Sequence, residues 1–218
     1  MLPTVYLLQI MHRLQSSFPK LSRITCYGSP KDLQQKSLED LILLKNAGLQ
    51  TIYLGIESGD DKVLAAVCKG TTAAQIIDGG KKVLSAGIKL SAMILLGLGG
   101  KDNSTTQAAL TAKVINEINP TMLSALTLML YNNTPLYNMT KAGHFKPLTS
   151  YEILEELRQI IAQLNLKNPC LFRCNHVSNI LPLSGLLPKD KENLLYELDT
   201  ALTYYKHNPI PLPVNDEY

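Results

Sequence analysis

The first candidate functional residues lie in a short segment bounded by glycines, where residues 55–59 read Gly-Ile-Glu-Ser-Gly. A carboxylate accepts hydrogen bonds from vicinal hydroxyls or from an ammonium group, and glycine lets a ligand approach the backbone closely. Glu57 is therefore a candidate ligand-binding residue. The alternative is that Glu57 caps the helix that follows it, helped by Ser58 and Asp60. Both interpretations remain open from the spacing alone.

A second candidate is the glycine-rich segment at residues 97–100, which reads Gly-Leu-Gly-Gly between an apolar run and a helical segment. It is not a dinucleotide-binding fingerprint, because the third glycine of the Gly-x-Gly-x-x-Gly pattern is missing. It is not a Walker phosphate-binding loop either, because no lysine–serine pair follows. We interpret it as a loop whose backbone amides and carbonyls face a flat ligand such as a base. The alternative is a tight turn into the helix.

A third group of polar residues lies late in the chain, where residues 175–179 read Asn-His-Val-Ser-Asn between apolar segments. Such a cluster at a strand end could contact a substrate, or it could tie down the last connection of the fold. The other histidines, His12, His144 and His207, have no carboxylate or cysteine partner at metal-ligand spacing and are assigned no role.

The four cysteines do not form a recognisable metal site. Only Cys170 and Cys174 are closely spaced, and no second pair completes a tetrahedral set. Free cysteines commonly behave as small buried hydrophobes. We expect this for all four, Cys26 and Cys68 included, and predict no metal ligands.

The elements that position these residues alternate between strand and helix. Strands are expected at residues 23–27, 51–56, 88–96 and 122–130. Helices are expected at 6–17, 36–47, 60–67, 72–86, 104–118 and 150–166, and a last helix is expected to begin after Pro188 and end at about residue 204. Strand starts roughly every 28–38 residues with intervening helices predict a parallel βα architecture, either a barrel or a doubly wound sheet. In both, ligands bind at the C-terminal ends of the strands. The apolar run at 88–96 predicts a strand in the centre of the sheet.

Composition narrows the class of protein. The chain has 218 residues, of which 45% are hydrophobic and 18% charged, with a net charge of +3. This predicts one globular domain over residues 1–207, with an extended proline-rich tail at 208–218. The charge excess is small and forms no basic stripe, so a nucleic-acid partner is not expected. No apolar run is long enough to span a membrane and no signal peptide is evident, so a cytoplasmic protein is expected.

The order of several short motifs resembles the radical S-adenosylmethionine (radical SAM) enzymes. The similarity is to the iron–sulfur oxidoreductase branch, which shares the core of the oxygen-independent coproporphyrinogen oxidases and the methylthiotransferases. The segments at 175–179 and 187–191 also look like that branch, so the resemblance covers residues 23–202. The motifs that carry it lie at residues 55–60, 68–72, 86–88, 95–100 and 134–137.

The resemblance implies a partial (β/α) barrel of the TIM-like type, with S-adenosylmethionine and a [4Fe-4S] cluster at its open face. An electron from the cluster would cleave S-adenosylmethionine to a 5′-deoxyadenosyl radical. The cofactor-binding residues implied are Glu57 and Ser58 for the ribose and methionine parts, and Leu96, Gly97, Leu98, Gly99, Gly100, Leu128, Met129 and Leu130 along the adenine. Substrate contacts are expected from Tyr27, His176 and Asn179.

The chain departs from the family pattern in one decisive respect, because its 218 residues contain no Cys-x3-Cys-x2-Cys triplet. The Gly-Gly-Glu-type motif is also absent, and Gly99-Gly100 replaces the commoner Pro-Gly-Glu. The chain thus resembles the C-terminal four or so βα units of the six-unit barrel. We expect it to bind no cluster by itself, and to support radical chemistry only when joined to a cluster-bearing segment.

Two other functions remain open at this stage. In the first, the chain has no catalytic role, and an exposed strand edge binds a partner or a second copy. In the second, Glu57 is the acid or base of a conventional small-molecule enzyme, although no nucleophile–base pair or metal triad accompanies it. The substrate is not specified by any of these patterns.

Overall fold

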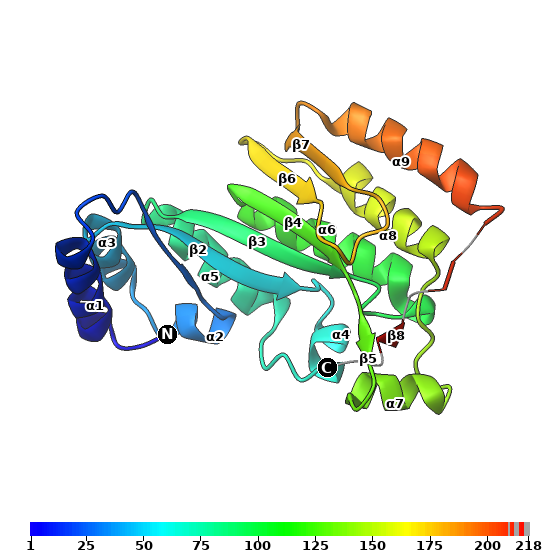
Figure 1. The fold of residues 1–218 in the computed structure, drawn as a ribbon, viewed down its shortest axis with the longest axis horizontal. Coiled ribbons are helices and arrows are strands. Elements are labelled where there is room, and N and C mark those ends of the chain that lie inside the picture. Colours follow the sequence, from blue (N-terminus) through cyan, green and yellow to red (C-terminus); the bar gives the residue numbers. More distant parts are fainter. Residues whose placement is uncertain (209, 212–213, 216–218) are drawn as a thin grey trace.

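A six-stranded sheet forms the centre of the molecule in the computed structural model, which describes residues 1–208, 210–211 and 214–215 (Figure 1). Neighbouring strands in the sheet are parallel, except that the last two are antiparallel. The sheet does not close, so its first and last strands are edges. In spatial order its strands are β1 (Ile24–Tyr27), β2 (Leu49–Glu57), β3 (Lys89–Leu96), β4 (Met122–Thr127), β6 (Cys170–Cys174) and β7 (Leu183–Leu187).

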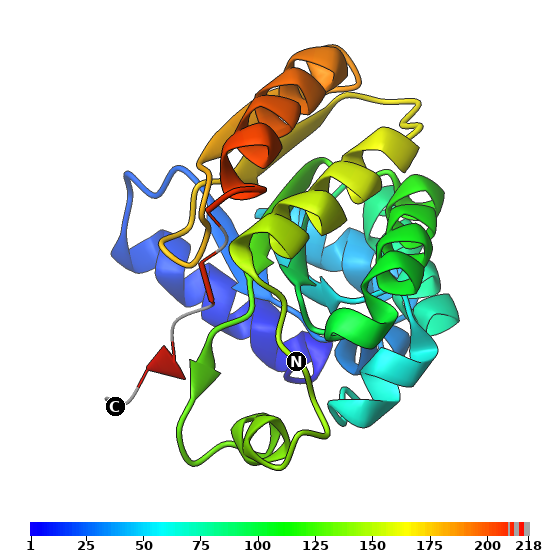
Figure 2. The ribbon, with the colours of Figure 1, turned by 90° about the vertical axis from the view of Figure 1, so that its right-hand side faces the viewer.

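Helices cover one face of this sheet and leave the other face open (Figure 2). No helix in the described ranges is long and apolar enough to cross a bilayer. The helices are α1 (Thr4–Ser17), α2 (Pro30–Gln34), α3 (Leu38–Asn46), α4 (Asp61–Ala66), α5 (Ala73–Ser85), α6 (Ser104–Ile118), α7 (Pro135–Lys141), α8 (Ser150–Gln163) and α9 (Lys191–Tyr205), with a 3-10 turn at Lys101–Asn103.

Alternating burial along the strands distinguishes the two faces of the sheet. In β2, Ile52, Leu54 and Ile56 are fully buried against the helices, whereas Tyr53 and Glu57 are half-buried. Successive strand residues point to opposite faces, so Tyr53 and Glu57 lie on the face without helices, called the open face below. The main hydrophobic core therefore lies between the sheet and the helix layer.

Local sequence explains where several helices begin. Ser37, Thr72 and Thr149 each cap a helix, and the residue three positions later returns a hydrogen bond to the cap, as in a capping box. Helix α7 begins with Thr134 as its cap and Pro135 in its first turn. These short-range signals fix the entry of each chain segment into the helix layer.

The predicted partial parallel βα barrel is confirmed, with β3 in the centre of the sheet. The strand expected at 122–130 is wrong in extent, because it ends at Thr127 and a separate short strand β5 (Leu130–Tyr131) leaves the sheet to pair with β8 (Val214–Asn215). Strands β6 and β7 and helices α2 and α7 were not predicted. The extended tail falls partly on residues 209, 212–213 and 216–218, which lie outside the described residues.

Candidate functional site

Three of the predicted ligand-binding segments meet at the C-terminal edge of the sheet. Strand β2 ends at Glu57, which is in register with Ile94 of β3. The backbone N–H of Leu128 donates to the carbonyl of Leu96 at 2.9 Å, which places the segment after β4 beside the loop after β3. Parallel strands gather their C-terminal ends at one edge, and this is where ligands bind in open α/β sheets.

The Glu57 side chain has an unusual placement at this edge. Its backbone φ is +62°, and the pairing of β2 with β3 shifts register between Gly55 and Glu57. The carboxylate accepts a hydrogen bond from Lys69 Nζ at 2.9 Å, and the two side chains are 29% and 24% exposed. A Cβ atom on Gly55 would lie 2.2 Å from Glu57 Oε1, so only glycine leaves room for the carboxylate. The result is a half-buried ion pair lying over Gly55.

Glu57 does not cap the following helix, so that alternative is wrong. Asp60 is the N-cap of α4 and its side chain accepts from the Lys62 N–H at 2.8 Å. Ser58 is fully buried, and its hydroxyl accepts from the Asp60 N–H. The Ser58 side chain therefore supports the turn, and its contact with a cofactor stays a prediction.

Lys69 is a functional candidate to which the sequence patterns assigned no role. It lies between α4 and α5, in a segment where Cys68 and Gly70 both have positive φ. Its ammonium group and the Glu57 carboxylate present opposite charges side by side on a partly solvated surface. When a ligand binds, the Glu57 carboxylate can accept from hydroxyl or ammonium groups of the ligand instead of from Lys69. Lys69 can then donate to a carboxylate at the other end of the ligand.

A buried glutamate of α8, Glu156, is hydrogen-bonded to the glycine-rich loop at residues 97–100 that follows β3. Glu156 of α8 is fully buried. Its carboxylate accepts from the Gly97 N–H at 2.8 Å and from Gln107 Nε2 at 3.0 Å, and it also contacts the hydroxyl of Ser104. Burial raises the pKa of the Glu156 carboxyl above its ordinary value. Glu156 was not among the candidate residues predicted from the sequence.

Gln107 also holds the loop at residues 97–100 in place. Its amide nitrogen also donates to the carbonyl of Leu95 at 3.3 Å, and its oxygen has no hydrogen-bond partner among the described residues. A Cβ atom on Gly99 would lie 2.7 Å from that oxygen, so the loop packs directly on the amide. The backbone of residues 97–100 is thus fixed before any ligand arrives.

Most of the predicted adenine-contacting side chains point into the protein. Leu96, Leu98, Leu128 and Leu130 are all buried, and Leu98, Leu128 and Leu130 pack together with Val63. A ligand along this edge would therefore meet backbone rather than these side chains. The roles of Gly97, Gly99, Gly100 and Met129 in binding stay predictions.

The polar group at residues 175–179 ties the β6–β7 connection to β4. The Thr127 N–H donates to Ser178 Oγ at 3.1 Å, and Asn179 Nδ2 donates to the carbonyl of Ala125 at 2.8 Å. Ser178 and Asn179 therefore hold the last connection of the fold in place, as one of the two interpretations of this segment predicted. His176 is exposed, with its Nδ1 atom 2.8 Å from Ser178 Oγ.

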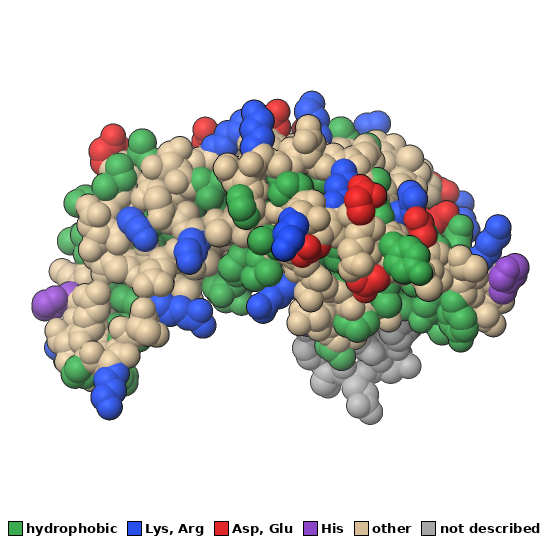
Figure 3. Space-filling model, turned by 90° about the horizontal axis from the view of Figure 1, so that it is seen from above, with side chains coloured by type: hydrophobic (Ala, Val, Ile, Leu, Met, Phe, Trp, Pro, Cys, Tyr) green, Lys and Arg blue, Asp and Glu red, His purple; other side chains and the backbone are tan. Residues whose placement is uncertain are grey.

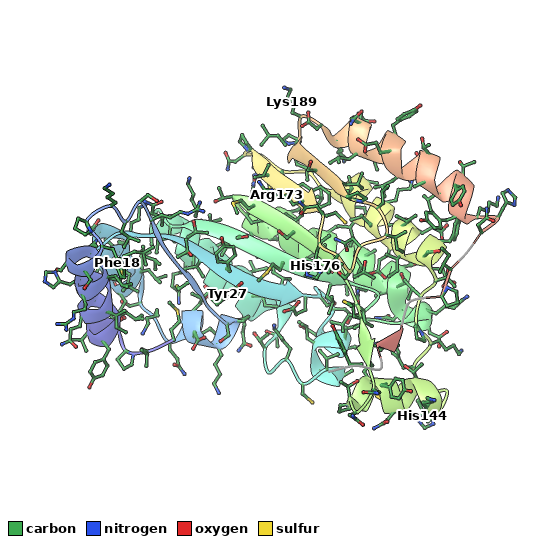
Figure 4. All side chains as sticks on the ribbon, viewed as in Figure 1. Phe18, Tyr27, His144, Arg173, His176 and Lys189 are labelled. Atoms are coloured by element: carbon green, nitrogen blue, oxygen red, sulfur yellow. The ribbon has the colours of Figure 1, made fainter. Side chains whose placement is uncertain are left out.

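Tyr27 lies at the C-terminal end of edge strand β1. It is 76% exposed, and its ring centroid is 5.3 Å from that of Tyr53 on β2. Figure 4 labels Tyr27 and His176 at the strand ends, whereas His144 lies at the periphery after α7. Substrate contacts by Tyr27, His176 and Asn179 stay predictions.

The cysteines present do not fit an iron–sulfur cluster. Cys170 and Cys174 are buried, and burial raises the pKa of each thiol to about 12, which disfavours the thiolate that binds metal. They lie four residues apart on one strand, a separation of about 13 Å. The described residues contain no group of three His, Cys, Asp or Glu that could hold a metal ion. The expectation that all four cysteines are buried is wrong for Cys68, which is exposed, and for Cys26, which is only half-buried.

The chain is similar to known proteins in sequence and in fold. The family model of the radical SAM superfamily matches residues 4–110. The tRNA uridine(34) acetyltransferase of Methanocaldococcus jannaschii is 22% identical over 165 residues, which are 75% of this chain and 29% of that protein.

Two solved structures share the fold. Elp3 from Methanocaldococcus infernus superposes with a TM-score of 0.60 at 18% identity, over 84% of this chain and 42% of that one. Coproporphyrinogen III oxidase (HemN) from Escherichia coli, a radical SAM enzyme, gives 0.58 at 18% identity, over 74% of this chain and 36% of that one. The chain thus spans less than half the length of each of these relatives. By its ordered motifs, its open parallel sheet and these matches, the chain resembles the radical SAM superfamily, whose family model matches its first half.

Proposed function

We propose that this chain is the S-adenosylmethionine-binding part of a radical SAM enzyme, and that the ligand binds at the C-terminal edge of β2, β3 and β4. The observation that carries the proposal is the Glu57–Lys69 ion pair over Gly55, with Nζ and Oε1 2.9 Å apart. A paired acid and base on a partly solvated strand end match a ligand that carries ribose hydroxyls and an amino-acid group.

Each part of the ligand has a chemically suited partner in this chain. The Glu57 carboxylate would accept from the ribose hydroxyls or from the ammonium group of the methionine part. Lys69 would donate to the methionine carboxylate. The backbone of residues 97–100, supported by Glu156 and Gln107, would lie along the adenine together with the backbone of residues 128–130.

The reaction of the superfamily is reductive cleavage of S-adenosylmethionine to a 5′-deoxyadenosyl radical, for which a [4Fe-4S] cluster supplies the electron. The cysteines of this chain do not fit that cluster, so no step of the cleavage is assigned to them. We propose that cleavage takes place only when a segment with three suitably spaced cysteines joins this sheet. We further propose that such an oxidoreductase is cytoplasmic.

The substrate is left open by the relatives. One is named as a tRNA acetyltransferase and another as a coproporphyrinogen oxidase, so the shared fold does not select between a macromolecular and a small substrate. Positive and negative side chains are scattered over the face shown in Figure 3, without one continuous basic stripe.

Calorimetric titration of the chain with S-adenosylmethionine tests the proposal. We expect Glu57→Gln and Lys69→Gln each to weaken binding about tenfold or more, because each removes a charge-assisted hydrogen bond worth roughly 1.5–3 kcal/mol. The matched control is Glu117→Gln, which breaks the Glu117–Lys81 ion pair of 2.7 Å on the helix side. The control should bind as the unaltered chain does.

Thermal melting of the same variants separates binding from stability. A half-exposed ion pair contributes little to folding, so the melting temperatures of the Glu57 and Lys69 variants should stay close to that of the unaltered chain. Lower stability with unchanged affinity would remove both residues from the site.

A second candidate function, self-association without catalysis, is favoured by the surface near β1. Strand β1 is an edge of the sheet, and α1 exposes Val5, Tyr6 and Ile10 to solvent. Unpaired strand edges and contiguous apolar side chains favour contacts between chains. We propose that two copies meet through this surface.

Sedimentation equilibrium tests the self-association. We expect the unaltered chain to dimerise, and the double variant Tyr6→Lys with Ile10→Lys to shift to monomer, because two charges would be buried in the interface. Tyr196→Lys is the control, because Tyr196 is equally apolar and 72% exposed on α9. A monomeric unaltered chain, or equal loss in the control, would exclude the α1 surface.

A further inference from the structure

The pairing of the strands aligns one row of residues across the open face, from the Glu57–Lys69 pair to the far edge. Gly55 of β2 is in register with Met93 of β3, and Met93 with Ser124 of β4. Ser124 is in register with Arg173 of β6, and Arg173 with Ser184 of β7. Residues paired in register share a face of the sheet, so a guanidinium group lies in this row between two hydroxyls.

Two cations of the six strands lie on the open face, Arg173 of β6 and Lys89 at the start of β3, and Glu57 is the only carboxylate of these strands there. Arg173 is exposed, and its guanidinium group forms no hydrogen bond or ion pair with any described residue. By contrast, Arg158 on α8 is held by Asp199 of α9, with Nη2 donating to Oδ2 at 3.1 Å. The guanidinium donors of Arg173 are therefore all free for a ligand (Figure 4).

We propose that Arg173, with the hydroxyls of Ser124 and Ser184 on either side, forms an oxyanion-binding subsite on the open face. A guanidinium group binds phosphate or carboxylate through two parallel hydrogen bonds, and neighbouring hydroxyls donate to the remaining oxygens. The subsite would take a group of this class, phosphate or carboxylate, on a small molecule.

The position of the subsite connects it with the proposed cofactor site. Neighbouring strands lie about 4.8 Å apart, so three strand steps separate Arg173 from Gly55 by about 14 Å. A small substrate anchored by its anionic end at Arg173 would extend along the row toward Glu57. That this anion belongs to the substrate rests on the proposed function, whereas the binding of an oxyanion by Arg173 does not.

Nuclear magnetic resonance of the arginine Nε–Hε groups tests the subsite, because the chain has only four arginines: Arg13, Arg23, Arg158 and Arg173. The chain is titrated separately with inorganic pyrophosphate and with malonate. We expect a saturable shift confined to Arg173, and the probe that binds more tightly identifies the phosphate or the carboxylate class. Equal, non-saturating shifts at Arg23 and Arg173 would show general attraction of anions and overturn the proposal.

Two charge-matched variants complete the experiment. Arg173→Gln should weaken binding of the preferred probe about tenfold, as expected for loss of a charge-assisted pair. Arg23→Gln removes the same charge from an exposed residue before β1 and should leave the affinity unchanged. Unchanged affinity in Arg173→Gln would also overturn the proposal.

Titration of Arg173→Gln with S-adenosylmethionine keeps the two proposals apart. We expect this variant to bind S-adenosylmethionine as the unaltered chain does, since Arg173 lies three strands from Gly55. A chain that binds pyrophosphate at Arg173 but not S-adenosylmethionine would retain the subsite and remove the proposed function. A chain that binds S-adenosylmethionine but not pyrophosphate or malonate at Arg173 would retain the proposed function and remove the subsite.

Discussion

Glu156→Ala should lower the free energy of unfolding by about 3–5 kcal/mol, because a buried acceptor is removed from several donors at once. The Gly97 N–H, the Gln107 amide and the Ser104 hydroxyl all converge on this carboxylate. Urea unfolding measures the loss. Glu155→Ala is the matched control on the same helix, and we expect it to change stability by less than about 0.5 kcal/mol because Glu155 is half-exposed.

Glu156→Gln should restore most of that stability. Its amide oxygen can accept from Gly97 and Gln107, while its NH₂ group donates to the hydroxyl of Ser104. Binding of S-adenosylmethionine should follow the same order, retained in Glu156→Gln and weakened in Glu156→Ala, if the loop must keep its shape. An alanine variant as stable as the unaltered chain would show that Glu156 does not hold the loop.

The stability of the unaltered chain relative to Glu156→Gln should also depend on pH. Burial raises the pKa of the Glu156 carboxyl above its ordinary value of 4.5. A carboxyl with a higher pKa in the folded chain than in the unfolded chain gives stability that is complete below the unfolded value and is lost as the pH rises through the folded value. The stability of the unaltered chain relative to Glu156→Gln should therefore fall as the pH rises from below 4.5 through the raised pKa, and then level off.

The sequence was most informative where local pattern and tertiary environment agree. The apolar run at residues 88–96 predicted β3, because a strand buried in the middle of a parallel sheet reads as a continuous hydrophobic stretch. Glu57 and the glycine-rich loop were found because each follows such a run. The C-terminal edge of the sheet could therefore be identified as the candidate site from the sequence alone.

Strands β6 and β7 were missed because little in their own sequences marks them as strands. Strand β6 has only five residues, and β7 contains Ser184 and Gly185 in its interior. Their pairing depends on contacts with β4 and with each other, which are distant in sequence. Arg173 therefore had no assigned place until the register was known.

Glu156 illustrates a signal that was present but not used. Within α8 it lies three residues after Ile153 and four before Ile160, both of which are buried. A carboxylate on the same stripe as core residues must find donors inside the protein. Lys69 gave no comparable signal, because its pairing with Glu57 depends on how the segment between α4 and α5 folds back.

The position of Ile94 gives the prediction with the largest expected effect on folding. Ile94 is 1% exposed on β3, and its register partner on β4 is Ala125. Its side chain points into the helix-covered core, whereas the adjacent Met93 points to the open face. Strand β3 has β2 on one side and β4 on the other, so a disruption there affects the whole sheet.

Ile94→Asp should prevent folding, because it places an unpaired carboxylate in the core at a cost of several kcal/mol, comparable to the total stability of an ordinary domain. Circular dichroism and thermal melting of the soluble fraction measure the result. Met93→Asp is the control on the same strand, and it should remain folded because its carboxylate reaches solvent on the open face. An Ile94→Asp variant that stays soluble and melts at the temperature of the unaltered chain would show that β3 does not lie at the centre of a buried sheet.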